Sequence, residues 1–380
     1  MKQKLNHFTA LTAFLLFGIM LLTRCQNDNI LISQFDQQVQ MIQEKYVPDQ
    51  TLDVFTAKIE KDRNAWLLKG ETTIPEAGKE LLVFADSVLG NNNYTNEFIQ
   101  LPHPSLGDSV YGIVKVSVAN IREKPRHSAQ LVDQNIMGKT LLLLKYDRGW
   151  YLIQTEYGYI GWMTGDSFVQ TDSSGLEKWE KESKIRVGKL YPLVYSKPDE
   201  NSEPVTDVVL NALLVLKEEG SFWSKVSTPD GRSGYIKTNC ITTVETLKLS
   251  QEALRKNLIL TARGMMGIPY LWGGNSSKGN DCSGFTQTTF KANGIELPRD
   301  SRQQALMGEE ITPDDTFSNI LPGDLLFFGS EDRVTHVGIS LGGAEFIHQG
   351  SQVDLNSLDP QKENFSPFRR RTLKYIKRIF

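Results

Sequence analysis

An internal repeat over residues 108–245 constrains the fold of this chain more than any other feature of its sequence. Each copy contains short alternating strands with turn residues between them, and in each copy a tryptophan follows a proline by 25 positions. The two pairs are Pro125 with Trp150 and Pro198 with Trp223. This pattern predicts two small all-β barrels, one over residues 108–175 and the other over residues 185–246.

On the N-terminal side of the repeat, residues 26–107 predict a small α+β domain. Apolar side chains recur at steps of three and four over residues 28–47, as they do along one face of a helix. Two alternating strands and a second helix follow, so the segment should form a helix-plus-hairpin domain. Its sequence offers no candidate catalytic residues.

Residues 1–25 predict an export signal. Lysines precede an apolar run of 15 residues, Phe8–Leu22, which is short for a membrane span and typical of a signal peptide. Cys25 follows where a bacterial lipoprotein signal has its acylated cysteine, although Arg24 departs from that pattern. We expect lipidation at Cys25, with plain export or an uncleaved anchor as the alternatives. Each places the domains in the cell envelope, either in the periplasm or on a membrane-anchored lipoprotein.

The overall composition excludes several classes of protein. The chain has 42 Lys and Arg against 45 Asp and Glu, a net charge of −3, and so lacks the basic excess typical of nucleic-acid binders. We therefore expect no nucleic-acid partner. Three cysteines in 380 residues are too few for a disulfide-stapled mini-protein or a four-thiolate zinc site.

The segment over residues 250–380 carries the candidate catalytic residues. Asp281 can cap a helix that begins with Cys282, which places the thiol in the first turn. The partial positive charge of a helix N-terminus favours a thiolate, and first-turn amides can bind the oxyanion of a tetrahedral intermediate. Cys282 is therefore a candidate nucleophile wherever a histidine can reach it.

Two histidines qualify, His336 and His348, which fall on two predicted strands joined by Leu341-Gly342-Gly343. They are symmetric about Gly342, so a three-residue turn would place them opposite each other on one face. A two-residue turn would place them on opposite faces, and we expect the three-residue turn or a bulge. A helix packed on this strand pair would bring Cys282 against His336. The alternatives are an inert cysteine with structural histidines, and a Cys-His-His zinc site, which lacks a fourth ligand.

Five motifs within residues 267–339 resemble, in family order, those of the NlpC family of papain-like cysteine peptidases. They are Pro269-Tyr270-Leu271-Trp272-Gly273-Gly274, Asp281-Cys282-Ser283-Gly284-Phe285, Pro298-Arg299-Asp300-Ser301, Pro322-Gly323-Asp324-Leu325 and His336-Val337-Gly338-Ile339. The barrels look like bacterial SH3-like domains, so the chain over residues 115–380 resembles γ-D-glutamyl-L-diamino-acid endopeptidases. The resemblance implies a multidomain α+β fold in which the N-terminal domain and two SH3-like β-barrels precede a papain-like α+β catalytic domain.

The resemblance also implies roles for individual residues. Cys282 would be the nucleophile, His336 the general base and acid, and His348 the residue that orients His336. The substrate-binding residues implied for the cleft are Tyr270, Trp272, Asp281 and Ser283. The first barrel would bind the free amine of an N-terminal L-Ala through Tyr159 and the residue at position 130. Gln130 stands at the place of an acidic residue, so it offers a hydrogen bond without a charge.

The implied function is that of an exported cysteine endopeptidase. It would hydrolyse the bond between γ-D-glutamate and L-Lys or meso-diaminopimelate in bacterial cell-wall stem peptides, through a thioester and without a metal or cofactor. We expect a monomer whose partners are peptidoglycan stem peptides or their fragments, and which meets the membrane only through an N-terminal lipid. The alternatives are a wall-binding module with an inactive third domain, and an amide or acyl transferase that uses the same thioester.

The basic tail that begins with Arg369-Arg370-Arg371 admits two interpretations. The first is a solvated strand end. The second is a contact with the carboxylates of the wall peptide.

Overall fold

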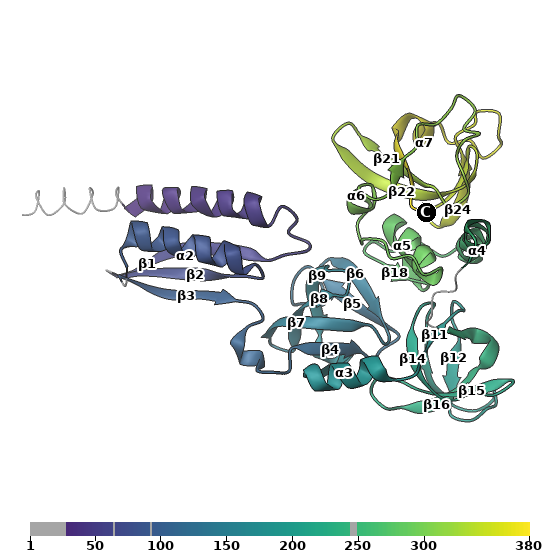
Figure 1. Ribbon diagram of the computed structural model, residues 1–380, viewed down its shortest axis with the longest axis horizontal. Coiled ribbons are helices and arrows are strands. Elements are labelled where there is room, and N and C mark those ends of the chain that lie inside the picture. Colours follow the sequence, from purple (N-terminus) through teal and green to yellow (C-terminus); the bar gives the residue numbers. More distant parts are fainter. Residues whose placement is uncertain (1–27, 64, 92, 244–248) are drawn as a thin grey trace, which may run out of the picture. The chain divides into compact units, whose positions relative to one another are not determined.

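The computed structural model describes residues 28–63, 65–91, 93–243 and 249–380 (Figure 1). The chain divides into two compact units, Met1–Pro104 and Ser105–Phe380. The predicted export signal, with Cys25, lies outside the described residues. Within the part of the chain that is described, no helix is both long enough and apolar enough to cross a bilayer.

The first unit contains the predicted helix and hairpin together with a third strand. The first helix covers residues 28–46 and ends before Pro48, which cannot continue it. Strands β1 and β2 are antiparallel, and β3 runs parallel to β2 after the crossover helix α2. These elements are β1 (Phe55–Asp62), β2 (Ala65–Thr72), α2 (Pro75–Leu89) and β3 (Tyr94–Gln100). The sequence analysis does not predict β3, because this strand lacks an alternating apolar pattern.

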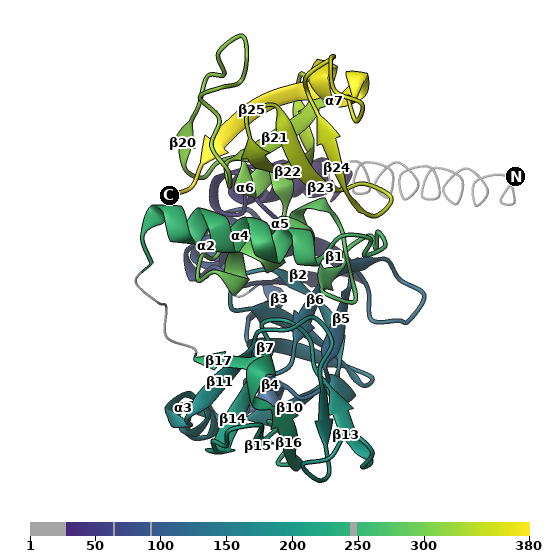
Figure 2. The same ribbon diagram turned by 90° about the vertical axis from the view of Figure 1, so that its right-hand side faces the viewer.

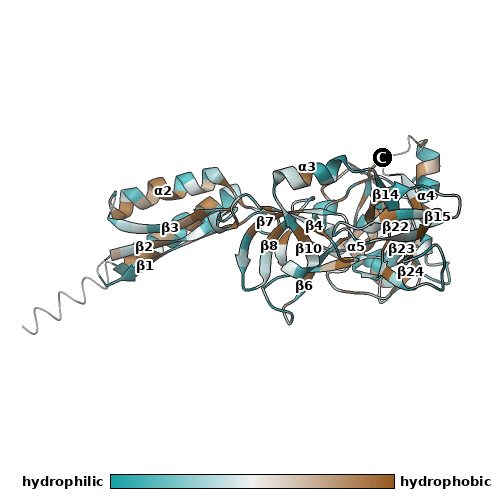
Figure 3. Ribbon diagram, turned by 90° about the horizontal axis from the view of Figure 1, so that it is seen from below, coloured by the Kyte–Doolittle hydropathy of each residue, from teal (hydrophilic) through white to brown (hydrophobic). Residues whose placement is uncertain are grey.

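Helix α2 shows why this unit has a core of its own. The helix is amphipathic (Figure 3). Its apolar face buries Leu81 and Ala85 in one cluster with Leu68 of β2 and Phe35 of the first helix, whereas Val83 on the other face is 71% exposed. Burial of one apolar stripe is the main source of stability for a helix of this kind.

The repeat folds into two sheets with the same topology. The first has strand order β10-β4-β7-β8-β9-β5-β6, and the second, read from its other edge, has the order β17-β11-β14-β15-β16-β12-β13. The two orders correspond position by position, so that β11 of the second copy occupies the place of β4 in the first, and β17 that of β10. The first copy contains β4 (Tyr111–Val114), β5 (Val118–Arg122), β6 (Leu131–Ile136), β7 (Thr140–Asp147), β8 (Trp150–Thr155), β9 (Ile160–Thr164) and β10 (Phe168–Thr171). The second contains β11 (Lys184–Val187), β12 (Leu193–Tyr195), β13 (Pro204–Asp207), β14 (Leu213–Glu218), β15 (Trp223–Ser227), β16 (Ser233–Lys237) and β17 (Ile241–Thr243).

A short helix connects the two copies. This helix, α3 (Ser173–Lys181), begins at Asp172, whose side chain accepts a hydrogen bond from the Gly175 N–H at 2.9 Å. Trp179 is buried, and its indole N–H donates to the Gly138 carbonyl of the first copy. The connection is therefore packed against the first barrel.

The C-terminal part of the chain packs helices against one six-stranded sheet of order β20-β25-β21-β22-β23-β24. Its strands are β20 (Glu309–Glu310), β21 (Leu325–Ser330), β22 (Arg333–Gly342), β23 (Glu345–Gln349), β24 (Val353–Ser357) and β25 (Leu373–Arg378), with a separate two-stranded pair β18 (Asn275–Ser276) and β19 (Gly279–Asn280). Its helices are α4 (Gln251–Gly264), α5 (Cys282–Ala292), α6 (Ser301–Gln304) and α7 (Pro367–Thr372). Helix α5 lies next to β22 and β23 (Figure 2). Phe285 and Phe290 of α5 share a buried core with Val337 and Ile347 of these strands, and this packing fixes α5 against the sheet.

Candidate active site

Cys282 begins the central helix of the C-terminal part, as predicted. The Asp281 side chain caps α5 by accepting a hydrogen bond from the Gly284 N–H at 2.8 Å. The cap satisfies one of the free amides of the first turn and fixes where the helix starts. The thiol is 8% exposed, so it faces the interior edge of a pocket and not open solvent.

The thiol is protonated at rest, which differs from the expected thiolate. Burial, reinforced by the neighbouring Asp281 carboxylate, raises the pKa of the Cys282 thiol to about 11. The backbone N–H groups of Val337 and Ser283 act in the opposite direction. The stabilisation of the anion by the helix terminus is therefore present, but the loss of hydration outweighs it.

The two histidines share one face of the β22–β23 pair, but they are not directly opposite each other. His348 pairs with Gly338, which lies two residues beyond His336, and the register shifts between Ser340 and Gly342. The predicted bulge is thus present, whereas the predicted direct pairing is wrong. A diagonal pair on one face still lets the rings meet, and His336 Nε2 lies 2.8 Å from His348 Nδ1.

A fourth residue, Asn356 of β24, extends this array. Its Oδ1 lies 2.9 Å from His348 Nε2, and its Nδ2 donates to the Leu355 carbonyl at 2.8 Å. Because the amide nitrogen donates to that carbonyl, the oxygen must face the imidazole and accept a hydrogen bond from His348 Nε2–H. His348 Nδ1 is then the acceptor for His336 Nε2–H, which leaves His336 Nδ1 unprotonated. The sequence analysis misses Asn356, because nothing near it in the chain marks it as a partner of His348.

Both imidazoles are neutral near pH 7. Burial holds the pKa of His336 well below its usual value of 6.5, and the Arg369 charge and His348 add to this effect. Burial also lowers the pKa of His348 to about 4, although its bond to Asn356 opposes the change. A neutral His336 can accept a proton, which a general base must do.

One pocket of about 420 Å³ gathers all the predicted substrate-binding residues around the thiol. Its lining includes Gln130, Tyr159, Tyr270, Trp272, Asp281, Cys282 and Ser283. Tyr159 is buried at 6% exposure, whereas Trp272 is 61% exposed. The first barrel and the C-terminal part therefore line the same pocket.

A buried arginine from the Pro298-Arg299-Asp300-Ser301 motif holds this site together. Arg299 forms ion pairs with Asp281 at 2.7 Å and with Asp133 of β6 at 2.6 Å. Its Nη1 also donates to the Ser283 hydroxyl at 2.9 Å. Arg299 therefore links Asp133 of the first barrel to Asp281, the cap of α5. The sequence marks this motif, but it does not indicate that Asp133 is its partner.

Asp300 is a second residue that sequence reasoning does not assign to the site. It lines the pocket together with Gln130 and Tyr159. Burial raises the pKa of Tyr159, and the nearby Asp300 charge is the next cause. The pocket therefore has a carboxylate near Tyr159 although position 130 holds an amide.

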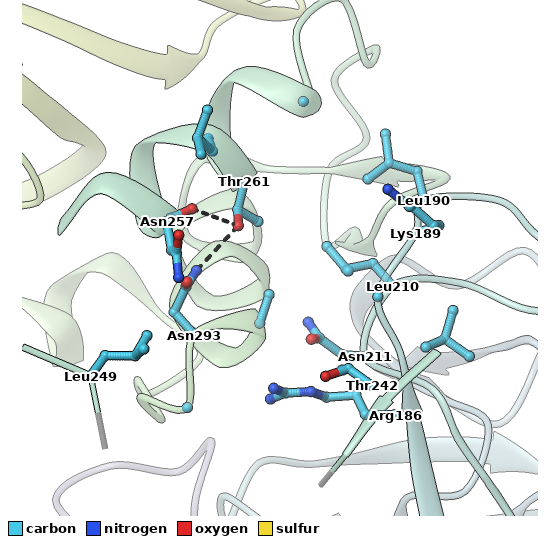
Figure 4. Close-up of a pocket in the computed structure, with 16 residues that line it drawn as sticks. Arg186, Lys189, Leu190, Leu210, Asn211, Thr242, Leu249, Asn257, Thr261 and Asn293 are labelled. Carbon is cyan, nitrogen blue, oxygen red and sulfur yellow. Dashed lines mark hydrogen bonds between the residues drawn. The ribbon is translucent and has the colours of Figure 1, made fainter. Parts of the chain in front are cut away.

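A second pocket, of about 490 Å³, lies between the second barrel and helices α4 and α5 (Figure 4). Arg186 and Asn211 approach it from the barrel, and Asn257, Thr261 and Asn293 approach it from the helices. Asn293 Nδ2 donates to the Thr261 hydroxyl at 3.2 Å. No cysteine, histidine or carboxylate is among the described residues that line this pocket. The described lining of this pocket therefore offers none of the nucleophilic or acid–base side chains that lie around Cys282.

Two parts of the chain match known families. Residues 267–370 match the NlpC/P60 family, and residues 117–168 match the bacterial SH3 domain.

Individual relatives agree with these matches. Dipeptidyl-peptidase 6 of Lysinibacillus sphaericus is 28% identical over 259 residues, which are 66% of this chain and 92% of that protein. The gamma-D-glutamyl-L-lysine dipeptidyl-peptidase of Bacillus subtilis (strain 168) is 32% identical over 214 residues, which are 53% of this chain and 64% of that protein. The crystal structure of an NlpC/P60 family protein from Bacillus cereus ATCC 10987 matches 71% of this chain and 99% of its own, with a TM-score of 0.60 and 23% identity. The expected fold class, with SH3-like barrels and a papain-like domain, is confirmed.

Proposed function

Residues 267–370 belong to the NlpC/P60 family of cysteine peptidases, and from this premise we propose that the protein hydrolyses the γ-D-glutamyl–L-diamino acid bond of cell-wall stem peptides. One observation carries the proposal. The Cys282 thiol at the start of α5 adjoins β22 at Val337, next to His336. His336, His348 and the Asn356 amide then form a hydrogen-bonded series. The name of the Bacillus subtilis relative, gamma-D-glutamyl-L-lysine dipeptidyl-peptidase, supports this choice of bond.

In the first half of the proposed reaction, Cys282 Sγ attacks the γ-carbonyl carbon of D-Glu while its proton moves to His336 Nδ1. The developing oxyanion is stabilised by first-turn amides of α5 and by the Tyr270 hydroxyl. Burial raises the pKa of Tyr270 to about 12, so this phenol stays protonated and can donate. His336 then gives its proton to the departing amine, which leaves a thioester on Cys282.

In the second half, water attacks the thioester carbon and His336 Nδ1 takes its proton. The carbon–sulfur bond breaks, the γ-carboxyl product is released, and the thiol regains a proton. His348 and Asn356 keep His336 in the tautomer whose Nδ1 is free to act as a base in both halves.

The substrate's N-terminal L-Ala is recognised through its free amine in this proposal. A buried ammonium needs a carboxylate partner, and Gln130 cannot supply one. Asp300, which lines the pocket with Tyr159 and Gln130, provides that charge. Tyr159 and Gln130 then add hydrogen bonds.

The proposed site of action is the cell envelope, with Cys25 carrying a lipid and the enzyme acting as a monomer. This part of the proposal rests on the pattern of residues 1–25. The protein with Cys25 should be found in the membrane fraction, and the Cys25→Ala variant should be found in the soluble fraction. If both proteins divide equally between the two fractions, the lipid anchor is ruled out.

The first test is mass spectrometry of the products from L-Ala-γ-D-Glu-L-Lys and from its meso-diaminopimelate form, each with a free and a blocked amine. The unmodified protein should release L-Ala-γ-D-Glu from the free-amine peptides. Cys282→Ala should release nothing while its circular dichroism is unchanged, and Cys240→Ala in the second barrel should retain full activity. Activity in Cys282→Ala would overturn the assignment of the nucleophile.

The same assay separates the competing functions. An added amine that appears in the product would identify a transferase. Binding of every peptide without cleavage would identify a wall-binding module in which the domain over residues 250–380 is inactive.

A second test concerns the amine. Asp300→Asn keeps a capping residue at the start of α6 but removes the charge, and it should raise KM for the free-amine peptides roughly tenfold or more, the range for a charged hydrogen bond. Gln130→Glu should lower KM for the free-amine peptides, because it adds a carboxylate to the pocket. If Asp300→Asn changes KM equally for blocked peptides, this carboxylate does not bind the amine.

A further inference from the structure

Two arginines lie on the histidine side of the thiol and take no part in the reaction described above. Arg369 belongs to α7, and its guanidinium carbon lies 5.4 Å from the centre of the Phe328 ring. Phe328 pairs in register with His336, and their ring centres are 5.8 Å apart. Arg369 is therefore separated from the proposed base by a single buried aromatic ring.

Arg333 lines the pocket that contains Cys282. It lies on β22 three residues before His336, and it lines the pocket together with Val334 and Thr335. The wall of the pocket that leads to the histidines thus carries a cation. The wall near Tyr159 carries Asp300, which is paired with Arg302 at 3.2 Å.

Neither arginine has a carboxylate partner in the part of the chain that the structure describes. Among the described residues, Arg333 and Arg369 form no ion pair and no side-chain hydrogen bond. Two other arginines of this chain are paired with carboxylates, as Arg378 is with Asp324 at 2.7 Å and the buried Arg299 is with two aspartates. The half-buried Arg122 and Arg186 donate to backbone carbonyls instead. Arg369 is half-buried, and removing a guanidinium from water without a partner is unfavourable. Its guanidinium faces the rings of Phe328 and Phe368, which contribute cation–π contacts but no negative charge. A bound carboxylate would supply that charge.

The chemistry of the reaction indicates which anion would come there. His336 must protonate the departing amine, so that nitrogen lies within hydrogen-bond reach of the imidazole. The departing amine is the α-amine of the diamino acid, and the α-carboxylate of that residue is two bonds away from it. A carboxylate of the leaving residue must then lie on the histidine side of the thiol, where both arginines are.

We propose that Arg369, assisted by Arg333, binds a carboxylate of the leaving diamino acid. This inference rests on the proposed function and narrows its substrate class to stem peptides in which the diamino acid carries a free carboxylate. Two sources offer the same chemistry: the α-carboxylate of a C-terminal diamino acid, and the side-chain carboxylate of meso-diaminopimelate. Arginine suits either, because its planar fork can hold a carboxylate through two parallel hydrogen bonds.

The test compares kcat and KM on four peptides that share L-Ala-γ-D-Glu. They end in L-Lys with a free α-carboxylate, L-Lys α-amide, meso-diaminopimelate with both carboxylates free, and its α-amide. The unmodified protein should prefer each peptide that has a free carboxylate over L-Lys α-amide by roughly tenfold to a hundredfold in KM, the range for hydrogen bonds to charged groups. Arg369→Gln should remove this preference, and Arg333→Gln should reduce it. Cleavage of meso-diaminopimelate α-amide as efficiently as the free acid would identify the side-chain carboxylate as the one bound.

The matched control is Arg371→Gln, an exposed arginine of the same helix, which should behave like the unmodified protein. A loss on L-Lys α-amide in Arg369→Gln that equals the loss on the three peptides with a free carboxylate would overturn the inference, since the guanidinium would then act only through the charges of the thiol and imidazole. Cleavage of L-Lys α-amide as efficiently as of the other three peptides by the unmodified protein would overturn it without any variant, and would leave the proposed function intact. Failure of the unmodified protein to cleave any of the four would instead reject the proposed function.

Discussion

At the scale of single residues, the site depends on groups held in their neutral forms. The Cys282 thiol is protonated because burial raises its pKa to about 11, and the imidazole of His336 is neutral because burial lowers its pKa. A resting thiolate–imidazolium pair is thus disfavoured on both sides. The proton must pass from sulfur to nitrogen as the substrate carbonyl is attacked, and the orientation set by His348 and Asn356 prepares the acceptor for that step.

This electrostatic state predicts how the thiol reacts with a simple electrophile. Only the thiolate is alkylated, so a raised pKa shifts the reaction to higher pH. We expect the rate of iodoacetamide modification at Cys282, followed by mass spectrometry of its peptide, to rise with a midpoint near pH 11. Cys240, which is less buried, is an internal comparison in the same sample. A midpoint below pH 8 would mean that the ion pair exists at rest.

At the scale of secondary structure, the N-terminus of α5 is stabilised by more than an ordinary cap. Asp281 accepts from the Gly284 N–H, as a capping residue does, and it also accepts two hydrogen bonds from Arg299. In α4 the cap is Ser250, whose side chain accepts from the Ala253 N–H at 3.3 Å and from no other described residue, and which faces solvent. The two caps therefore have different consequences when they are removed.

The matched substitutions are Asp281→Ala and Ser250→Ala, compared by urea unfolding. Ser250→Ala should cost about 1 kcal/mol of unfolding free energy, the usual value of an exposed cap. Asp281→Ala should cost about 3–5 kcal/mol, because it also leaves the buried Arg299 without one of its carboxylates. Activity should survive the first substitution and not the second. Equal costs would show that the Arg299 pair adds nothing to the cap.

At the scale of the second unit, the two barrels are attached to the C-terminal part in different ways. Asp133 of the first barrel is fully buried and pairs with Arg299, and Tyr157 donates to the same carboxylate. Asp207 of the second barrel pairs with Lys278, but both side chains are about 40% exposed, at 39% and 45%. The buried pair links the first barrel to the cap of α5, so we expect that barrel to be required for the geometry at Cys282.

Neutral substitutions of these two aspartates test the difference. Asp133→Asn should lower the unfolding free energy by about 3–5 kcal/mol, because a buried arginine loses a charged partner. Asp207→Asn should cost less than about 1 kcal/mol, because water already screens that pair. Thermal or urea unfolding measures both, and kcat should fall only in the first. A small effect of Asp133→Asn would mean that the first barrel does not brace the cap.

The sequence by itself determined those features that depend on neighbours along the chain. The repeat specifies two barrels of one topology, Asp281 specifies where α5 begins, and the two-residue period of strands places His336 and His348 on one face once a bulge is allowed. Tertiary structure alone decided the partners of the buried polar groups. Asn356 behind His348, Asp133 beside Arg299 and Arg369 over Phe328 come from segments whose separation in sequence carries no periodic signal. It also decided the charge state of the thiol, because the pKa of a buried group is set by the water it loses and by the charges that packing brings to it, and neither is written in its local sequence.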